Sequence, residues 1–181
     1  LGEWLGVSRP SVPEMVHRVE PEGLVTVDRA ITLTAEGRPL AEVVVRRHRL
    51  AERFLSEVLG LPWVKVHHEA ETWEHMISAD VEEAMWRVLG DPKTCPHGNP
   101  IPGAGYKPPR MVAISDMGIG ATGKLERISE ELELDDQTMD FLDQAGLRPG
   151  AEVHVAGRSP HGASTVQVVG RDPVGLDDYV A

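Results

Sequence analysis

Residues 47–75 have the sequence RHRLAERFLSEVLGLPWVKVHHEAETWEH, which predicts two helices separated by a turn at Gly60-Leu61-Pro62. We expect the first helix to cover about residues 38–59 and the second about residues 64–77. At about 100° per residue, each helix has one apolar face that should enter a core. On the first helix this face holds Val44, Ala51, Leu55 and Val58, and on the second it holds Val66, Ala70, Trp73 and Ile77.

Histidine and glutamate side chains gather at the margins of these two apolar faces. The first helix places there His48 and Glu52, and the second places there His67, Glu71, Glu74 and His75. Crowded carboxylates repel one another and lose hydration unless a cation or a proton compensates them. Nitrogen and oxygen donors without a thiolate suit Mn(II) or Fe(II) better than structural zinc. The pattern predicts a metal site, although solvated helix charges with hydrogen-bonded histidines are the alternative.

The remaining histidines and the single cysteine are not expected to be ligands. Cys95 lies in a proline-rich turn, and residues 96–103 are predicted to form a linker. The other histidines lack a carboxylate at a convincing spacing and should be structural or solvent-facing; they are His17, His97, His154 and His161. One cysteine cannot form an intrachain disulfide, which favours a reducing cytoplasm.

Composition limits the class of protein further. The 181 residues are 41% hydrophobic and 26% charged, which suits one large or two small domains and argues against disorder. The purely apolar runs are only a few residues long, so we expect a soluble protein without a membrane span. A net charge of -11 argues against non-specific coating of nucleic acid. Because the acidic and basic side chains of residues 1–50 balance, the composition permits one confined DNA contact there.

The N-terminal residues have the form of a helix-turn-helix. Gly6 supplies the turn, and the second helix would present to DNA Ser8, Arg9, Pro10, Ser11 and Glu14. Alternating residues 25–33 predict a hairpin, or wing, with Arg29 near its tip. A plain helical hairpin is the alternative, and Pro13 would remove one helix hydrogen bond. Leu1 already lies within a helical pattern, so we expect further residues upstream.

The C-terminal part has a different periodicity. Val153 and Val155, and then Val166 and Val168, have the period-two spacing of an antiparallel hairpin. A helix over residues 135–145, ended by Gly146, should precede this hairpin. A small β-barrel is the predicted arrangement.

Several motifs, taken in order, resemble the diphtheria toxin repressor (DtxR) family of metal-dependent transcriptional regulators. They are Gly23-Leu24-Val25, residues 47–55, Gly60-Leu61-Pro62-Trp63, His67-x-Glu69-Ala70, Trp73-Glu74-His75 and residues 98–103. The resemblance implies a mainly α protein with small β parts. A winged helix-turn-helix DNA-binding domain, incomplete at its N-terminus, would cover residues 1–36. A helical metal-binding and dimerisation domain would cover residues 37–103. A linker would cover residues 104–110, and a C-terminal SH3-like β-barrel residues 111–181.

The resemblance also implies roles for individual residues. The family's ancillary metal site would consist of His48, Glu52 and His67, completed by Glu130 and Glu133 from the SH3-like domain. The primary site would hold Glu71, Glu74 and His75. Ser8 and Pro10 match residues that contact thymine methyl groups and the DNA backbone in the family.

Three differences from the family pattern change what is expected. Glu71 replaces the cysteine of iron-sensing members and matches the manganese-sensing (MntR-like) branch, which favours Mn²⁺ with Fe²⁺ as the alternative. Glu14 replaces the usual glutamine of the recognition helix, so the resemblance does not predict the operator sequence. The family's first helix, which donates a primary-site ligand, is absent from these residues.

The combined expectation is a homodimeric repressor that binds double-stranded operator DNA when loaded with Mn(II) and controls metal-homeostasis genes. The predicted helix over residues 80–89 would form part of the dimer interface through Val81, Ala84, Met85 and Val88, with ordinary core packing as the alternative. We expect no enzyme activity and no small-molecule substrate. A metal-dependent hydrolase is less favoured because no separate base or nucleophile accompanies the ligands. A metal-buffering module that never binds DNA is the other alternative.

Overall fold

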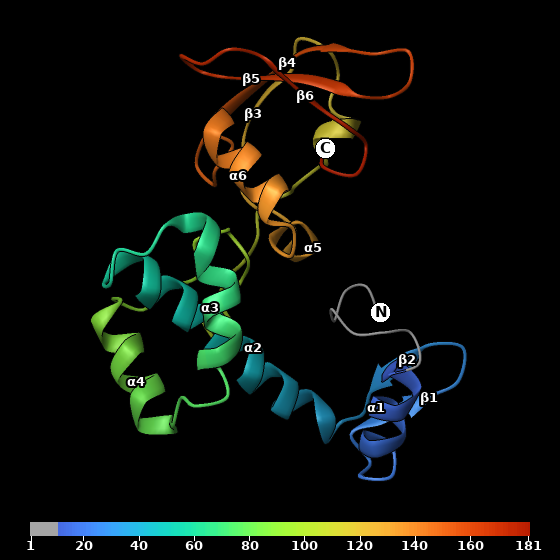
Figure 1. The fold of residues 1–181 in the computed structure, drawn as a ribbon, viewed down its shortest axis with the longest axis vertical. Coiled ribbons are helices and arrows are strands. Elements are labelled where there is room, and N and C mark those ends of the chain that lie inside the picture. The colour runs from blue at the N-terminus through green and yellow to red at the C-terminus, as the bar shows by residue number, and fades with distance from the viewer. Residues whose placement is uncertain (1–10) are drawn as a thin grey trace.

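The computed structural model describes residues 11–181, whose helices and strands form three groups along the chain (Figure 1). The first group contains α1 (Ser11–Val19), β1 (Val25–Val27) and β2 (Ile31–Leu33). The strands are antiparallel, and Val27 pairs with Ile31, so residues 28–30 form the tip. This confirms the predicted hairpin. Pro13 lies in the first turn of α1, where backbone N–H groups have no partner within the helix and no bond is lost.

The first group is joined tightly to the start of α2 (Gly37–Glu57). Thr34 donates a hydrogen bond to the Gly23 carbonyl at 2.6 Å and accepts one from the Gly37 amide at 2.9 Å. A Cβ atom on Gly37 would lie 1.9 Å from the Leu24 carbonyl oxygen, so only glycine fits there. From this junction α2 runs into the second group, so one helix connects the hairpin to the helical core (Figure 1).

The second group consists of α2, the 3₁₀ helix η1 (Trp63–Lys65), α3 (Val66–Trp73) and α4 (Ala79–Val88). Their core contains Leu50, Ala51, Leu55, Val66, Ala70, Ile77, Met85, Ile101 and Ala104. The second predicted helix is shorter than expected, because α3 ends at Trp73 and Ser78 then caps α4. Among residues 11–181, no helix combines the length and apolar character needed to cross a lipid bilayer.

Two residues of the first predicted helix were wrongly predicted to face the core. Val44 and Val58 are 39% and 47% exposed, whereas Ala51 and Leu55 are buried as expected. Apart from Gly37, the buried positions of this 21-residue helix lie between His48 and Leu55. The neighbouring segments therefore cover only one face of the C-terminal half of α2, and periodicity alone does not indicate where this cover begins and ends.

The third group has one antiparallel sheet in the order β3-β4-β5-β6. Its elements are η2 (Ile114–Asp116), β3 (Thr122–Lys124), α5 (Glu130–Glu133), α6 (Asp136–Ala145), β4 (Glu152–Arg158), β5 (Ser164–Val168) and β6 (Val174–Leu176). Val153, Val155 and Val166 point into the core, as their alternation predicts. Gly146 adopts a φ of 74° and ends α6, also as predicted.

Residues 95–101 form an interior loop, which corrects their prediction as a linker. Cys95, His97, Asn99 and Ile101 are all buried. A Cβ atom on Gly98 would lie 2.1 Å from the carbonyl oxygen of Glu126, so this loop lies directly against the third group. The prolines of the loop exclude a helix, as predicted. Its burial depends on packing against the neighbouring groups, which the local sequence does not show.

Candidate metal centre

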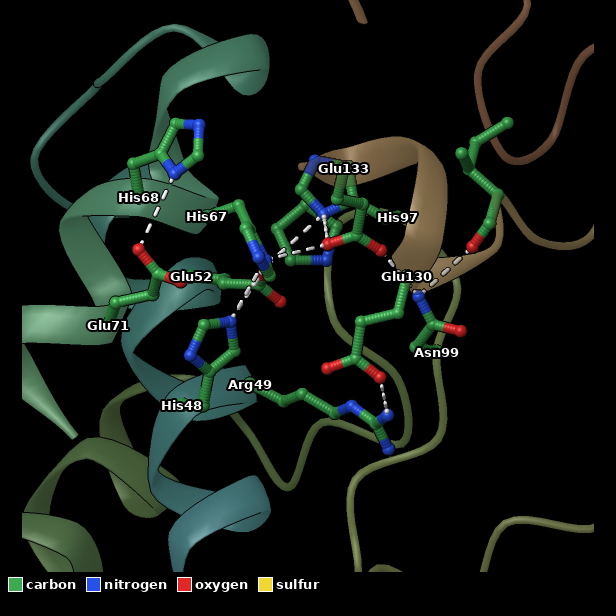
Figure 2. A network of polar contacts seen from close by, with 12 residues as sticks. His48, Arg49, Glu52, His67, His68, Glu71, His97, Asn99, Glu130 and Glu133 are labelled. Atoms are coloured by element: carbon green, nitrogen blue, oxygen red, sulfur yellow. Dashed lines mark hydrogen bonds and ion pairs between the residues drawn. The ribbon is translucent and has the colours of Figure 1, made fainter. Parts of the chain in front are cut away.

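Five buried side chains meet where the second and third groups join (Figure 2). His48 and Glu52 lie one turn apart on α2, His67 comes from α3, His97 from the loop and Glu133 from the end of α5. Each is no more than 6% exposed. We call these residues the buried centre.

Short contacts link the donor atoms of the buried centre, with Glu52 shared between its histidines. The Nδ1 atom of His67 lies 3.1 Å from Oε2 of Glu133 and 3.2 Å from Oε1 of Glu52. The Nε2 atom of His48 lies 3.1 Å from the same His67 nitrogen, and Nδ1 of His97 lies 3.0 Å from Oε2 of Glu133. Adjacent ligands of an octahedral cation with bonds of about 2.1 Å are separated by about 3.0 Å. The donor spacing fits a metal of this kind.

Hydrogen bonds to the outer ring nitrogens turn two imidazoles toward the centre. His48 donates from Nδ1 to Glu74 at 2.7 Å, and His97 donates from Nε2 to the Trp63 carbonyl at 3.1 Å. Because a carboxylate and a carbonyl only accept, the other nitrogen of each ring carries the lone pair in the neutral form. Within residues 14–181, Glu52 Oε2 has no hydrogen-bond partner, and His97 Nδ1 faces Glu133 at 3.0 Å without forming an aligned hydrogen bond. Buried polar atoms whose hydrogen-bonding capacity is unused in this way suit a cation.

The histidines and carboxylates of the buried centre stabilise one another's charged forms. Burial would lower the pKa of His48, but hydrogen bonds with Glu52 and Glu74 outweigh it and raise the pKa to about 10. Burial would also lower the pKa of His67, but hydrogen bonds with Glu133 and Glu52 outweigh it and raise that pKa to about 9. Burial would raise the pKa of Glu52, but its contacts with the three histidines hold that pKa well below its usual value. Protons therefore stabilise the carboxylates until a metal replaces them.

Cys95 and His97 were not predicted to belong to a site. Glu52, Cys95 and His97 offer donor atoms that all lie within 4.8 Å of one another. The expectation that His97 lacks a carboxylate partner is therefore wrong, because Glu52 and Glu133 both face it. Burial and the nearby Glu52 raise the pKa of the Cys95 thiol to about 12. The Cys-x-His spacing inside a glycine- and proline-rich turn was the available signal.

Two polar residues organise the predicted ligands from α5. Asn99 donates a hydrogen bond to Glu133 at 2.6 Å and thereby orients its carboxylate. Arg49 forms an ion pair with Glu130 at 2.9 Å and also donates to the Pro100 carbonyl. The structure thus places Glu133 within the buried centre, and it places Glu130 on Arg49 beside that centre (Figure 2).

The remaining predicted ligands lie at the surface end of α3, and we call them the outer set: Glu71, Glu74 and His75. Glu71 lies 3.4 Å from His68, and its side chain is 53% exposed. His75 is 71% exposed and lies 3.4 Å from Glu74. Among the described residues, these three do not bring donor atoms together as the buried centre does. Glu74 connects the two sets, because its other oxygen accepts from His48.

The predicted DNA-contacting residues are only partly covered by the structure. Ser8, Arg9 and Pro10 lie outside the described residues, and Ser11 is the first residue of α1. Glu14 is exposed on α1, and Arg29 is exposed at the tip of the hairpin. Both side chains are therefore accessible to a partner.

Comparisons with known proteins cover most of the chain. Residues 34–103 match the family model "Iron dependent repressor, metal binding and dimerisation domain", and residues 112–181 match the FeoA domain. The iron-dependent repressor IdeR of Mycobacterium tuberculosis is 38% identical, covering 100% of this chain and 84% of that protein. The diphtheria toxin repressor of Corynebacterium diphtheriae is 38% identical, covering 98% and 83% respectively.

Solved structures show the same likeness. A manganese-dependent transcriptional repressor in complex with manganese is 34% identical, with a TM-score of 0.86, and the match covers 99% of this chain and 85% of that one. The FeoA match and this similarity support the predicted winged-helix and SH3-like fold class. The matched proteins are repressors and not enzymes, in agreement with the prediction. The chain belongs to the diphtheria toxin repressor family of metal-dependent transcriptional repressors.

Proposed function

We propose that this protein is a homodimeric repressor that binds operator DNA when loaded with Mn(II), and that it controls genes of metal homeostasis in the cytoplasm. The observation that carries the proposal is the buried centre, where imidazole and carboxylate donors from α2, α3, the 95–101 loop and α5 converge. A bound divalent cation supplies the positive charge that these carboxylates otherwise take from protons. The proposed ligands are His48, Glu52, His67 and Glu133, and we add His97.

Mn(II) is proposed over Fe(II) because nitrogen and oxygen donors predominate. Glu71 offers a hard carboxylate, and the buried centre offers imidazoles and carboxylates. Cys95 is the one soft donor nearby, and its raised pKa keeps the thiol neutral at pH 7 before a cation arrives. Fe(II) remains the alternative metal, as the names of the iron-dependent relatives suggest.

We propose that the outer set forms a separate metal site, which corresponds to the primary site of the family. A further ligand from the N-terminal side would join Glu71, Glu74 and His75 there. Exposure leaves Glu71 and His75 free to move, and the hydrogen bond between Glu74 and His48 connects this site to the buried centre. Glu130 would join the ancillary site only by leaving Arg49. Metal acts on DNA binding only if it prefers the DNA-competent arrangement.

The DNA contact is proposed to involve α1 and the hairpin. Ser11 and Glu14 of α1, together with the preceding Ser8, Arg9 and Pro10, would contact a major groove, and Arg29 would lie near phosphate. Because Gly37 packs against the hairpin backbone, the direction of α2 sets the position of this unit relative to the buried centre. A metal that stabilises the helical group would thereby set the separation of two recognition helices in a dimer.

We propose that α4 contributes to the dimer interface. Val81 and Val88 are 48% and 64% exposed, whereas Met85 packs in the helical core. The predicted apolar stripe is therefore divided: Met85 is in the core, Ala84 is half-buried, and Val81 and Val88 are the exposed residues that a partner could cover. The proposed domains keep the bounds 1–36, 37–103 and 111–181, with residues 104–110 as linker.

A gel-shift assay on a pseudo-palindromic operator, with and without Mn(II), tests this function. We expect a shift only in the lane with metal, and we expect the double variant Glu71→Ala, His75→Ala to lose this dependence while its circular dichroism is unchanged. The variant Glu69→Ala, on the same helix, is the control and should bind as the wild type does. Equal DNA binding in both lanes, or none in either, would contradict the proposal.

A further inference from the structure

Trp63 belongs to the helical group in sequence but to the C-terminal group in packing. It opens η1, directly after Pro62, and its side chain is 7% exposed. It belongs to the same buried core cluster as residues of the third group, including Ile128, Leu132 and Met139. The indole is therefore inserted from one group into the interior of the other.

The same residue contacts the loop that carries His97. The Trp63 carbonyl accepts the hydrogen bond from His97 Nε2 at 3.1 Å, and the indole Nε1 donates to the Pro96 carbonyl at 3.1 Å. The indole and imidazole rings also pack together, with centroids 4.7 Å apart. Backbone and side chain of Trp63 together fix the position and the tautomer of His97.

Further contacts attach this arrangement to the third group. The guanidinium of Arg148, which follows α6, lies 5.3 Å from the centroid of the Trp63 ring. The Ile128 amide donates to the His97 carbonyl at 2.9 Å. Separation of the third group would therefore expose the indole and remove contacts on both sides of His97.

We propose that Trp63 is a positioning residue that couples docking of the C-terminal group to metal binding at the buried centre. Docking of the indole holds His97 with Nδ1 toward Glu52 and Glu133, and a cation held by those three groups in turn retains the C-terminal group. The inference rests on the proposed function, since it needs metal at the buried centre, but it assigns a role to a residue that is not itself a ligand.

The test is a double-mutant cycle between Trp63 and His97 in the full chain, with Mn(II) affinity measured by calorimetry. Trp63→Leu keeps an apolar side chain but loses the indole N–H and the ring contact, and should weaken Mn(II) binding about tenfold. Trp63→Phe, which restores an aromatic ring, should recover part of this loss. In a His97→Ala background, Trp63→Leu should change the affinity by less than about twofold, because the residue through which it acts is gone.

A second readout concerns the docking of the C-terminal group. Arg110 is exposed between the two groups and is a site for trypsin, because Met111 follows it. Mn(II) should slow cleavage there in the wild type and should slow it much less in Trp63→Leu. The control is Trp86→Phe, a partly buried tryptophan of the helical core, which should match the wild type in both measurements.

The possible results separate this inference from the proposed function. Equal Mn(II) affinity of Trp63→Leu and wild type would overturn the coupling alone. The same fold-loss with and without His97 would also overturn it, since Trp63 would then act only on general stability. A wild-type chain that takes up no Mn(II) would remove the proposed function and this inference with it.

Discussion

The buried centre and the outer set use the same two residue types but are constructed differently. The proposed ligands of the buried centre come from α2, α3, the 95–101 loop and α5, and core packing holds each of them at no more than 6% exposure. The outer set comes from one stretch of five residues at the end of α3, where Glu71 and His75 are largely exposed. Tertiary packing brings donors into a preformed arrangement only in the first case.

This difference has a consequence for how each set binds a metal. In the buried centre, the cost of placing carboxylates and imidazoles together is met when the protein folds, so a metal needs to displace only protons. In the outer set, side chains must still be ordered when the metal arrives, which opposes binding. We therefore expect the buried centre to bind more tightly and the outer set to respond only at higher metal concentration.

The largest expected effect follows from replacing Glu52, which contacts every histidine of the buried centre. Glu52→Gln should weaken Mn(II) binding at this centre about 100-fold or more, because ligand loss exceeds the typical effect of losing a supporting residue. It should also lower the free energy of unfolding of the metal-free protein by about 3 kcal/mol, since protonated imidazoles would remain buried without their partner. Calorimetry and urea denaturation measure the two effects.

The matched control for this variant is Glu57→Gln, which lies on the same helix, pairs with Arg53 and is 44% exposed. It should leave Mn(II) binding unchanged and alter stability by less than about 1 kcal/mol. If Glu52→Gln bound Mn(II) as tightly as the wild type, the buried centre would not be the tighter of the two metal sites.

The pH dependence of binding should be steeper at the buried centre. The pKa values of His48 and His67 are raised to about 10 and about 9, so both rings are protonated at neutral pH before metal binds. Each displaced proton should increase Mn(II) affinity by up to about tenfold per pH unit between pH 6 and 7.5. Calorimetry in buffers of different ionisation enthalpy counts the released protons. Binding without proton release would contradict these protonation states.

The same shifts predict how stability changes without metal. A histidine with a raised folded pKa stabilises the protein fully below its unfolded pKa of about 6.5. That contribution is lost as the pH rises through about 9 and 10. The metal-free protein should therefore become less stable between pH 6.5 and 10, and thermal denaturation over this range should show the decline.

A smaller effect is expected from changing the softness of the outer set. Glu71→Cys replaces a hard oxygen with a thiolate and should raise the response to Fe(II) relative to Mn(II) about tenfold in an anaerobic gel-shift titration. Glu71→Gln keeps an oxygen donor without the charge, and should weaken the response to both metals without changing their ratio. An unchanged ratio in Glu71→Cys would place metal selectivity elsewhere, with Cys95 as the first residue to test.

The elements that the sequence predicts correctly are those decided by local pattern. The hairpin at residues 25–33 and the pair β4 and β5 follow from alternation, and Gly146 ends α6 with a positive φ that glycine adopts without strain. The family resemblance pointed to Glu133, which the structure places in the buried centre.

The features that the sequence does not predict depend on contacts between distant segments. His97 lies 30 residues after His67 in a proline-rich loop, and its burial depends on Gly98 fitting against the Glu126 carbonyl. The exposure of Val44 and Val58 depends on how far the neighbouring helices extend along α2. No periodicity within one segment carries this information. The metal roles of the outer set stay a prediction.

The smallest expected effect separates the stability of the helical group from metal binding. Glu82 on α4 accepts hydrogen bonds from Arg46 and from Arg47, the latter at 2.9 Å, and so joins α4 to α2. Glu82→Gln should lower the free energy of unfolding by about 1 kcal/mol and leave Mn(II) affinity unchanged, whereas the exposed neighbour Glu83→Gln should alter neither. Burial would raise the pKa of Glu82, but the two arginines lower it, so its contribution is present above about pH 4.5 and is lost at lower pH. The difference between Glu82→Gln and wild type in urea denaturation should therefore shrink in acid. A matching loss of Mn(II) affinity would show instead that α4 helps to hold the buried centre, and that this centre is less self-contained than its packing indicates.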